Sequence, residues 1–341
     1  MVYNHGNPCY TDRDRGDMMS LKEELLRYLE EHREAPVSGQ LLAERLSVSR
    51  AAVWKAVKSL EEEGHRITAA TNRGYQLEAA SDVLTAQGVR YHLRPAYRDC
   101  AVLVERRVGS TNTQVKKLAA DGAGGRTILL ADEQTAGRGR MGRGFYSPAL
   151  TGVYMSLLLR PETDSAQLPI ITVAAAAAVC EAIEALTGLE TQVKWVNDVL
   201  VGGRKVCGIL TEAVSDFESG RTESVIVGIG VNVKTPPALF PAELREIAGS
   251  LLPASVSRNR LAAEIANRLF DYAADLPGRA YLEPYRRRLM VLGKRVRFYR
   301  EGAWQSGRAV GLDGDGCLEV ETPSGAVLLR AGEIRMEGEP I

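Results

Sequence analysis

The spacing of apolar residues changes twice along this chain of 341 residues, and each change indicates a different kind of domain. Residues 20–77 hold three short blocks with helical spacing, followed by a stretch with strand character. Segments with helical and with strand spacing then alternate over residues 91–288, and residues 293–336 hold short β runs. At roughly 100–200 residues per domain, the chain is long enough for such a three-part organisation.

The first block predicts a winged helix-turn-helix. Leucines over residues 21–29 and 41–46 mark two amphipathic helices, and Ser49 can cap a third helix. Residues 67–77 predict a β-hairpin wing. Between Arg45 and Leu60 the chain carries four basic residues and no acid, which favours DNA phosphates over a helical domain that binds protein or merely packs. The expected DNA contacts are Ser49, Arg50, Lys55 and Lys58.

Histidine is confined to the first 92 residues, at His5, His32, His65 and His92. The rest of the chain therefore excludes serine-hydrolase triads, histidine zinc sites and histidine proton shuttles. The five cysteines are scattered and show no C-x-x-C spacing, which indicates a reducing cytoplasm without a disulfide framework.

Composition indicates a soluble cytoplasmic protein. It has 45% hydrophobic and 25% charged residues, and its 43 basic residues balance 43 acidic ones, so contacts with nucleic acid must be local. The longest nearly apolar run, residues 170–180, is about half of the ~20 residues that span a bilayer, so no membrane partner is expected. We expect residues 1–18 to be a disordered leader.

The central segment predicts a mixed α/β domain, preceded by a linker at residues 79–87. Turns at residues 313–316 and 324–325 divide the last segment into a small barrel of about five strands. Central strands are expected at 102–108, 127–131, 153–159, 192–195 and 225–233, and helices at 113–120, 168–187 and 257–274.

Residues 137–143, GRGRMGR, interleave three glycines with three arginines. Glycines permit close approach of a ligand, and guanidinium groups bind carboxylate or phosphate oxygens through paired donors. The segment contains G-x-G-x-x-G, but a dinucleotide fingerprint requires these glycines to open a helix, whereas Pro148 and a β-type run follow. A kinase loop is excluded because no His-Arg-Asp can occur. We therefore expect an anion-binding loop rather than a solvated basic turn.

Three further segments carry side chains suited to ligand binding. Residues 194–198 (KWVND) follow a strand, residues 203–210 lead from a turn into another strand, and residues 228–232 read GIGVN. Together they supply anion donors and a metal carboxylate without an imidazole. That inventory fits a ligase in which a substrate carboxylate attacks an α-phosphate, since the protein must mainly position and neutralise two anions.

These motifs, with Ser110-Thr111-Asn112 and Gln134, resemble the bifunctional biotin protein ligase and biotin-operon repressor family. The resemblance implies an α+β multidomain fold: a winged helix-turn-helix at 19–80, a central mixed α/β class II synthetase-like ligase domain at 84–288, and an SH3-like barrel at 289–341. It also implies condensation of biotin with ATP and Mg²⁺ to biotinyl-5′-AMP, then transfer to a lysine of a biotin carboxyl carrier protein. The adenylate would be the corepressor that promotes homodimerisation and binding to operator DNA.

The resemblance also implies residue roles. Arg140 and Lys205 would be catalytic, and Asp198 would hold Mg²⁺ with ATP. The remaining roles fall into two groups: biotin would contact Ser110, Thr111, Asn112, Gln134, Arg138, Gly139, Arg140 and Lys205, while ATP and the adenylate would contact Arg140, Arg143, Asn197, Asp198 and Asn232.

Two features depart from the family pattern. Val196 stands where proline is usual, and residues 234–252 contain no tryptophan to cover the adenine, so Phe240 is the aromatic candidate there. For Lys194 and Trp195 structural roles are preferred, and Cys207 is expected to be a small buried filler. The alternative functions are a ligand-sensing DNA-binding regulator without ligase turnover, and a ligase of another carboxylate such as lipoate, which the fused winged helix disfavours.

Overall fold

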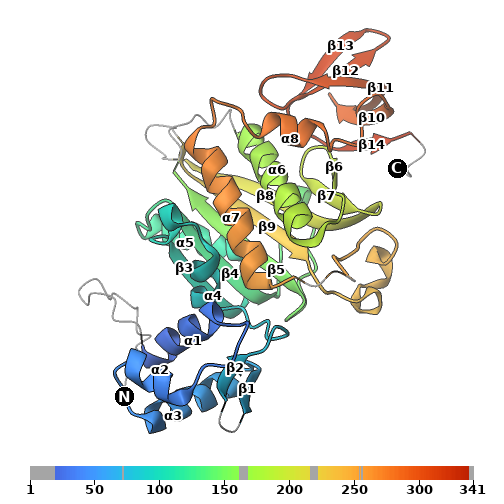
Figure 1. Cartoon of the computed structure of the whole chain (residues 1–341). Coiled ribbons are helices and arrows are strands. Elements are labelled where there is room, and N and C mark those ends of the chain that lie inside the picture. Colours follow the sequence, from blue (N-terminus) through green and yellow to red (C-terminus); the bar gives the residue numbers. More distant parts are fainter. Residues whose placement is uncertain are drawn as a thin grey trace, which may run out of the picture. The chain divides into compact units, whose positions relative to one another are not determined.

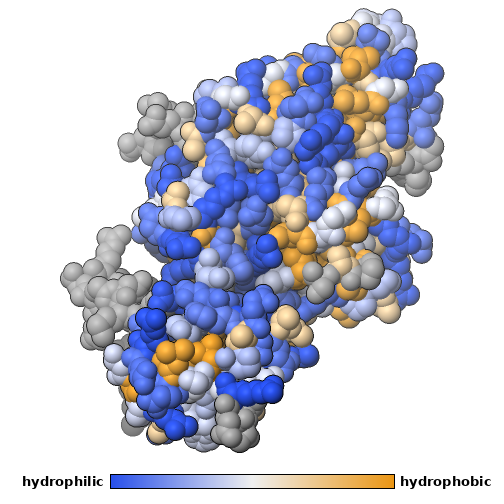
Figure 2. All heavy atoms as spheres, in the orientation of Figure 1, coloured by the Kyte–Doolittle hydropathy of each residue, from blue (hydrophilic) through white to orange (hydrophobic). Residues whose placement is uncertain are grey.

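The structure is a computed structural model that describes residues 20–70, 73–160, 168–215, 222–252, 254 and 256–337. The chain divides between Ser81 and Asp82 into two compact units (Figure 1). The leader expected at residues 1–18 lies outside the described residues. On both units the face drawn in Figure 2 is predominantly hydrophilic, and the apolar residues that reach it form small separate patches.

The first unit is a winged helix-turn-helix, as the sequence predicts. Its helices begin directly after three serines, Ser20, Ser38 and Ser49, whose side chains accept hydrogen bonds from backbone N–H groups of the first turn. Leucines and valines on the inner faces of the helices form its core. The elements are α1 (Leu21–Glu31), α2 (Gly39–Arg45), α3 (Arg50–Glu62) and the antiparallel pair β1 (Ile67–Ala70) and β2 (Gly74–Leu77).

The second unit is built on a seven-stranded mixed sheet with the order β3-β4-β5-β9-β8-β7-β6. Only β3 and β4 run parallel, and every other neighbouring pair is antiparallel. All eight residues of β5 are buried, which explains why its sequence is apolar without alternation. The strands are β3 (Ala101–Val108), β4 (Thr127–Gln134), β5 (Gly152–Leu159), β6 (Gln192–Lys194), β7 (Asp198–Val201), β8 (Arg204–Ser215) and β9 (Thr222–Asn232).

Helices cover both faces of this sheet. α6 and α7 pack together on one face, where most of the core lies, and α5 packs against β4, β5 and β9 around a smaller apolar cluster (Figure 1). In β9, Ile226 belongs to the smaller cluster and its neighbours Val225 and Val227 to the main core, as strand alternation requires. The helices are α4 (Ala86–His92), α5 (Thr111–Ala120), α6 (Leu168–Thr187), α7 (Arg258–Ala274) and α8 (Leu282–Arg286), with 3₁₀ turns η1 (Pro95–Tyr97), η2 (Arg140–Gly142), η4 (Pro237–Leu239) and η5 (Ala242–Leu244).

Helix α6 has the bounds that the sequence predicts. By length and composition alone, its segment Pro169–Thr187 is long and apolar enough to cross a membrane. The sequence analysis considered only the shorter run at residues 170–180 and therefore underestimated the length of the apolar segment. Yet 72% of that window is buried inside the protein, and five consecutive alanines, residues 174–178, let α7 and the sheet approach closely. The helix is therefore a core helix of this unit.

The C-terminal segment forms a five-stranded antiparallel sheet with the order β13-β12-β11-β10-β14. Asp313 shapes the turn between β11 and β12, because its Oδ1 accepts from the backbone N–H groups of Asp315 and Cys317, both at 2.8 Å. Val296, Phe298 and their neighbours join the main core of the second unit. The strands are β10 (Arg295–Arg300), β11 (Ala303–Leu312), β12 (Leu318–Thr322), β13 (Gly325–Leu329) and β14 (Ile334–Met336).

The prediction of a linker at residues 79–87 is wrong at its C-terminal end. Helix α4 begins at Ala86, and Thr85 caps it by accepting from the N–H of Gly88 at 3.0 Å. With only seven residues, α4 gives a weak periodic signal, and its packing on α7 holds it in place.

Candidate active site

One cavity of about 520 Å³ in the second unit is lined by the central sheet, the arginine loop and the C-terminal sheet. The structure brings to this cavity all twelve residues for which a ligand role was predicted: Ser110, Thr111, Asn112, Gln134, Arg138, Gly139, Arg140, Arg143, Asn197, Asp198, Lys205 and Asn232. Their individual roles stay predictions, and the contacts below show what each group is able to bind.

The first group lies where β3 and β4 end. Because these strands are parallel, the start of α5 after β3 and Gln134 at the end of β4 meet at one edge of the sheet. Gln134 Oε1 accepts from the backbone N–H of Thr111 at 2.9 Å, and its Nε2 donates to Ser147 Oγ at 2.9 Å. The Gln134 amide is thereby fixed in orientation, as selective recognition of a polar ligand group requires.

Asn112 is the centre of a second polar network. Its Nδ2 donates to Glu212 Oε2 at 2.7 Å, and Ser156 Oγ lies 2.6 Å from its Oδ1. Burial raises the pKa of Glu212, but hydrogen bonds from Lys116 and Asn112 outweigh it, so that the pKa is lowered. Arg138 also approaches this anionic carboxylate, at 3.3 Å. Sequence analysis missed Ser156 and Glu212, because each is a single polar residue in a strand without a local motif.

Two glycines of β9 leave room for these groups. A Cβ added at Gly228 would lie 2.2 Å from Asn112 Oδ1, and one at Gly230 would lie 2.4 Å from the ring of Phe145. Larger residues are therefore excluded unless the neighbours move. Asn232 follows Gly228 by four residues, which corresponds to about 13 Å along a strand. The cavity thus extends along β9 from the Asn112 network to Asn232.

Cationic groups lie on the next strands. Lys205 Nζ, at the start of β8, lies 2.7 Å from Asp198 Oδ1 at the start of β7. Arg140 donates to Asn197 Oδ1 at 2.8 Å and to the carbonyl of Gly332 at 3.2 Å. Burial lowers the pKa of Arg140, which Asp198 opposes, and arginine remains charged in proteins. A partly buried guanidinium whose hydrogen-bond partners, Asn197 and the carbonyl of Gly332, are neutral is suited to an anionic ligand.

The loop that carries these arginines is tied to the C-terminal sheet. Arg143 lies 3.0 Å from Glu333, which also pairs with Arg335 at 3.0 Å. Burial raises the pKa of Glu333, but hydrogen bonds from Arg143 and Arg335 outweigh it and lower the pKa. The glycines of the loop open no α-helix, since η2 is a single turn, which agrees with rejecting a dinucleotide fingerprint.

The far end of the cavity offers an amide and aromatic rings. Asn232 Nδ2 donates to the carbonyl of Gly249 at 3.0 Å, while its buried Oδ1 has no hydrogen-bond partner within the described part of the chain. Phe240 lines this cavity, and Tyr146 lies against it with ring centroids 6.3 Å apart. Tyr146, which lies outside residues 234–252, is therefore a second aromatic candidate beside Phe240. An unfilled acceptor beside aromatic rings fits an adenine with its exocyclic amine.

The carboxylates of the cavity fit a nucleotide-bound metal rather than a site built by protein alone. No group of three His, Cys, Asp or Glu residues suited to a metal occurs among the residues that the structure describes. Asp198 is the carboxylate beside Lys205, and Mg²⁺ is commonly held by one or two carboxylates together with substrate phosphates. Asp198 fits that arrangement.

Comparisons with known proteins agree with this architecture. Family models match at residues 104–232 (Biotin/lipoate A/B protein ligase family), 22–76 (HTH domain) and 291–336 (Biotin protein ligase C terminal domain). The bifunctional ligase/repressor BirA of Bacillus subtilis (strain 168) is 34% identical over 326 residues, which cover 93% of this chain and 99% of that protein. The chain belongs to the BirA family of bifunctional ligase/repressors.

Other relatives of the BirA family match over shorter parts of the chain. The biotin–[acetyl-CoA-carboxylase] ligase of Mycobacterium tuberculosis is 34% identical and covers 66% of this chain and 85% of its own length. Among solved structures, the biotin protein ligase of Aquifex aeolicus in complex with biotin and ATP has a TM-score of 0.59 at 28% identity. It covers 70% of this chain and 99% of its own length.

The DNA-binding residues predicted for this BirA family member lie on α3 or, in the case of Ser49, at its N-cap. Arg50, Lys55 and Lys58 are exposed, and Lys58 pairs with Glu61 at 2.6 Å, a hydrogen bond that raises its pKa. Ser49 uses its hydroxyl to cap the helix, accepting from the N–H of Ala52 at 3.2 Å. Trp54, which the sequence analysis did not consider, is 52% exposed on the same helix, directly before Lys55.

Three residues set aside in the sequence have defined surroundings. Trp195 is buried, and its indole N–H donates to the carbonyl of Gly316 at 3.3 Å. Trp195 and Lys194 also line the cavity. Cys207 is fully buried, and burial raises its pKa well above that of an ordinary thiol. A thiolate nucleophile is therefore not available at this position.

Proposed function

We propose that this chain joins biotin to ATP, forming biotinyl-5′-AMP, and then transfers biotin to a lysine of a biotin carboxyl carrier protein. The observation that carries the proposal is a single cavity with three different surroundings along β9. The Asn112 and Gln134 networks suit the ureido group of biotin, and Lys205 with Arg140 suits two anions. Asn232 at the far end suits the adenine.

The first step needs no protein nucleophile. An oxygen of the biotin carboxylate attacks the α-phosphorus of ATP, the bond to the β-phosphate bridge breaks, and pyrophosphate leaves. Lys205 and Arg140 bring the two anions together and offset their repulsion. A magnesium ion on the nucleotide, which Asp198 would help to hold, would neutralise phosphate charge. Lys205 is free to serve this role once a ligand anion competes with Asp198.

The second step releases AMP. The acceptor lysine amine attacks the acyl carbon of biotinyl-5′-AMP, the acyl–phosphate bond breaks, and the nitrogen loses a proton to form the amide. Arg138, Arg140 and Arg143 lie on the loop that would cover the adenylate before the acceptor arrives. Its pairing with Glu333 gives the loop a second anchor on the C-terminal sheet.

We further infer that the same chain represses transcription in response to biotin. The exposed basic residues of α3 suit the major groove of operator DNA. Biotinyl-5′-AMP would be the corepressor, and two copies would bind a two-fold operator. The proposed use of ATP, a carrier acceptor and operator DNA agrees with a cytoplasmic location, which is part of this proposal. The division between Ser81 and Asp82 supports the proposed DNA-binding domain at 19–80. Within the second unit, which is a single compact unit, we propose a ligase domain at 84–288 and a C-terminal domain at 289–341.

The test combines the purified chain with ATP, Mg²⁺, biotin and an acceptor domain, and follows biotinylation of the acceptor lysine by mass spectrometry. Wild-type protein should modify one lysine, and Arg140→Ala should release the adenylate early. The matched control is Arg160→Ala, which removes a surface pair with Glu223 outside the cavity. Adenylate formation without transfer, with intact operator binding, would instead favour a sensor without ligase turnover. Lipoate in place of biotin should give no product.

A further inference from the structure

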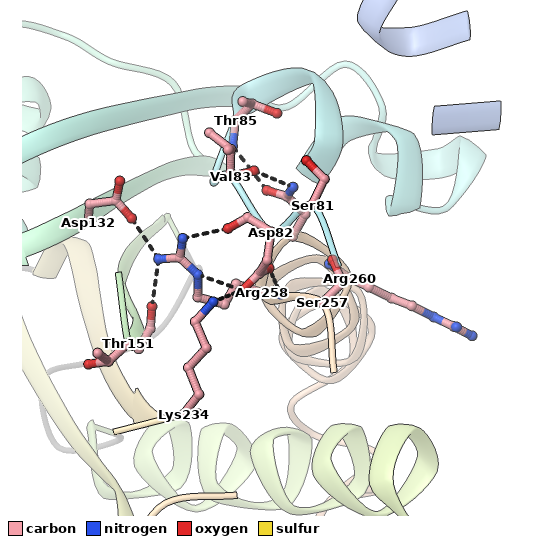
Figure 3. Close-up of polar contacts among 12 residues, drawn as sticks. Ser81, Asp82, Val83, Thr85, Asp132, Thr151, Lys234, Ser257, Arg258 and Arg260 are labelled. Atoms are coloured by element: carbon pink, nitrogen blue, oxygen red, sulfur yellow. Dashed lines mark hydrogen bonds and ion pairs between the residues drawn. The ribbon is translucent and has the colours of Figure 1, made fainter. Parts of the chain in front are cut away.

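An ion cluster centred on the buried side chain of Arg258 lies where the chain enters the second unit (Figure 3). The side chain of Arg258 is 1% exposed, although it begins α7. Its Nε lies 3.1 Å from Asp82 Oδ2 and its NH1 2.6 Å from Asp132 Oδ1. Lys234 Nζ lies 2.7 Å from the same Oδ2 of Asp82. Two cations and two anions thus share one network, as the low dielectric of a buried site requires.

The cluster fixes the first residues of the second unit. Asp82 Oδ1 accepts from the backbone N–H of Arg258 at 2.8 Å, and the Asp82 carbonyl accepts from the Arg258 guanidinium at 2.7 Å. Asn259 then binds both Val83 and Thr85, accepting from the N–H of Thr85 at 3.0 Å and donating to the carbonyl of Val83 at 2.9 Å. Residues 82–85, which follow directly on the DNA-binding unit, are held by the N-terminal turn of α7.

The same cluster reaches the nucleotide end of the cavity by two routes, through Lys234 and Arg258, and the biotin end by one, through Asp132. Lys234 lies two residues after Asn232, and Asp132 lies two residues before Gln134. Arg258 NH1 is also 3.4 Å from the carbonyl of Gly152, which is the register partner of Asn232 between β5 and β9. Asn232 is thus joined to Asp82 by a continuous set of contacts through Gly152, Arg258 and Lys234.

We propose that Arg258 and Lys234 are positioning residues that couple occupation of the adenylate end of the cavity to the chain segment 82–85. This inference rests on the proposed function, since it takes biotinyl-5′-AMP as the ligand. Neither residue lines the cavity, so both act through Asn232, Gly152 and Asp82 rather than on the reacting atoms. The coupling uses contacts within the second unit alone.

Lys234→Gln is the informative variant, because its side chain is 41% exposed and its loss leaves the Arg258 pairs in place. Its matched control is Asp271→Asn, a side chain that is 42% exposed near the other end of α7. Asp271 accepts from Tyr97 at 2.6 Å and pairs with Arg94, far along the chain from β9. Lys234→Arg keeps the cation and should restore wild-type behaviour.

The full-length chain is studied by hydrogen exchange of the amides at 82–85, without ligand and with biotin, ATP and Mg²⁺, beside steady-state adenylate formation. In the wild type, the ligands should slow exchange at 82–85. In Lys234→Gln this response should shrink and the KM for ATP should rise, by roughly two- to thirtyfold, with kcat little changed. Asp271→Asn should respond like the wild type.

The outcomes separate the two proposals. A Lys234→Gln variant that forms adenylate and keeps the full exchange response would overturn the coupling while leaving the ligase assignment in place. The coupling would also be overturned if Asp271→Asn weakened the exchange response as strongly as Lys234→Gln does, because the effect would then come from the packing of α7 in general. A wild type that formed no adenylate would overturn the proposed function and, with it, this inference. Asp82→Asn, which removes the shared anion, should reproduce the Lys234→Gln result.

Discussion

Among single residues, Gly228 is the position where the cavity depends most directly on one side chain being absent. Gly228→Ala would place a Cβ 2.2 Å from Asn112 Oδ1, so Asn112 has to move away from Glu212 and Ser156. Overpacking of this kind costs about 1–3 kcal/mol. We expect the KM for biotin to rise by roughly tenfold or more, and the KM for ATP to change much less.

The control for that variant is Gly124→Ala, because an added Cβ there meets nothing within 4 Å. Initial rates of pyrophosphate release at varied biotin and varied ATP give both constants. Equal increases in the two KM values would mean that Gly228 supports the sheet in general and not the biotin end of the cavity.

Trp54 is a second residue whose role can be measured by itself. It is exposed between Arg50 and Lys58 on α3, at the i+4 spacing that places all three on one face. Burial of its ring against DNA would add apolar contact to phosphate neutralisation, so Trp54→Ala should weaken operator binding by roughly ten- to a hundredfold, or about 1–3 kcal/mol. Fluorescence anisotropy of a labelled operator duplex measures this affinity. Trp304→Ala, in the C-terminal sheet, should leave the affinity unchanged.

Single residues also show where sequence reasoning succeeds and fails. Residues in dense motifs, such as Arg140 and Lys205, could be found because several unusual residues stand together in the chain. Glu212 and Ser156 could not, because each reaches Asn112 only after β5 and β8 are placed beside β9. Phe145 belongs to the same class, since its contact with Gly230 joins residues that are distant in sequence.

Among the secondary-structure elements, those with a full amphipathic period and a capping residue were predictable. α3 and α7 begin directly after Ser49 and Ser257, and α6 is apolar over most of its length. α4 and the short strand β7 were not identified, because seven and four residues carry too little periodicity, and both are stabilised by tertiary packing. The order of strands in the sheet, which places β9 between β5 and β8, is a long-range property that local patterns do not contain.

The ion pair between Glu184 of α6 and Arg288, which follows α8, predicts how the stability of the fold depends on pH. Burial raises the pKa of Glu184, but hydrogen bonds from Arg288 and Thr191 outweigh it and lower the pKa to about 2, from 4.5. An acid with a lowered folded-state pKa stabilises the fold above its unfolded pKa and loses that contribution as the pH falls. The free energy of unfolding should therefore decrease between about pH 4.5 and pH 2.

The corresponding variant is Glu184→Gln, which keeps the shape and removes the charge. It should be less stable than the wild type at pH 7, and the difference between the two should narrow as the pH is lowered through that window. Urea unfolding followed by circular dichroism at several pH values measures both slopes. A constant difference from pH 7 down to pH 2 would mean that the Glu184 pair contributes no linked stability.

For the chain as a whole, the net charge of zero conceals two separated basic regions, one on α3 and one on the loop at residues 137–143. The first suits a polyanion that extends beyond the protein, and the second suits small anions enclosed by a cavity. The proposed corepressor role of biotinyl-5′-AMP implies that the ligand state of the cavity controls DNA binding. Operator affinity should therefore depend on which ligands fill the cavity and not only on salt.

A gel shift with operator DNA tests this dependence. Biotin and ATP together should increase operator affinity, because biotinyl-5′-AMP, unlike either substrate, would occupy the surroundings of Asn112, Lys205 and Asn232 at once; all three residues line the cavity. Biotin alone, ATP alone, or lipoate with ATP should have little effect. Raising the salt concentration should weaken every complex, because phosphate contacts release counterions, but it should leave the ratio between ligand states nearly unchanged. A ratio that fell to one at moderate salt would show that the ligands act through charge alone and that the two units are not coupled.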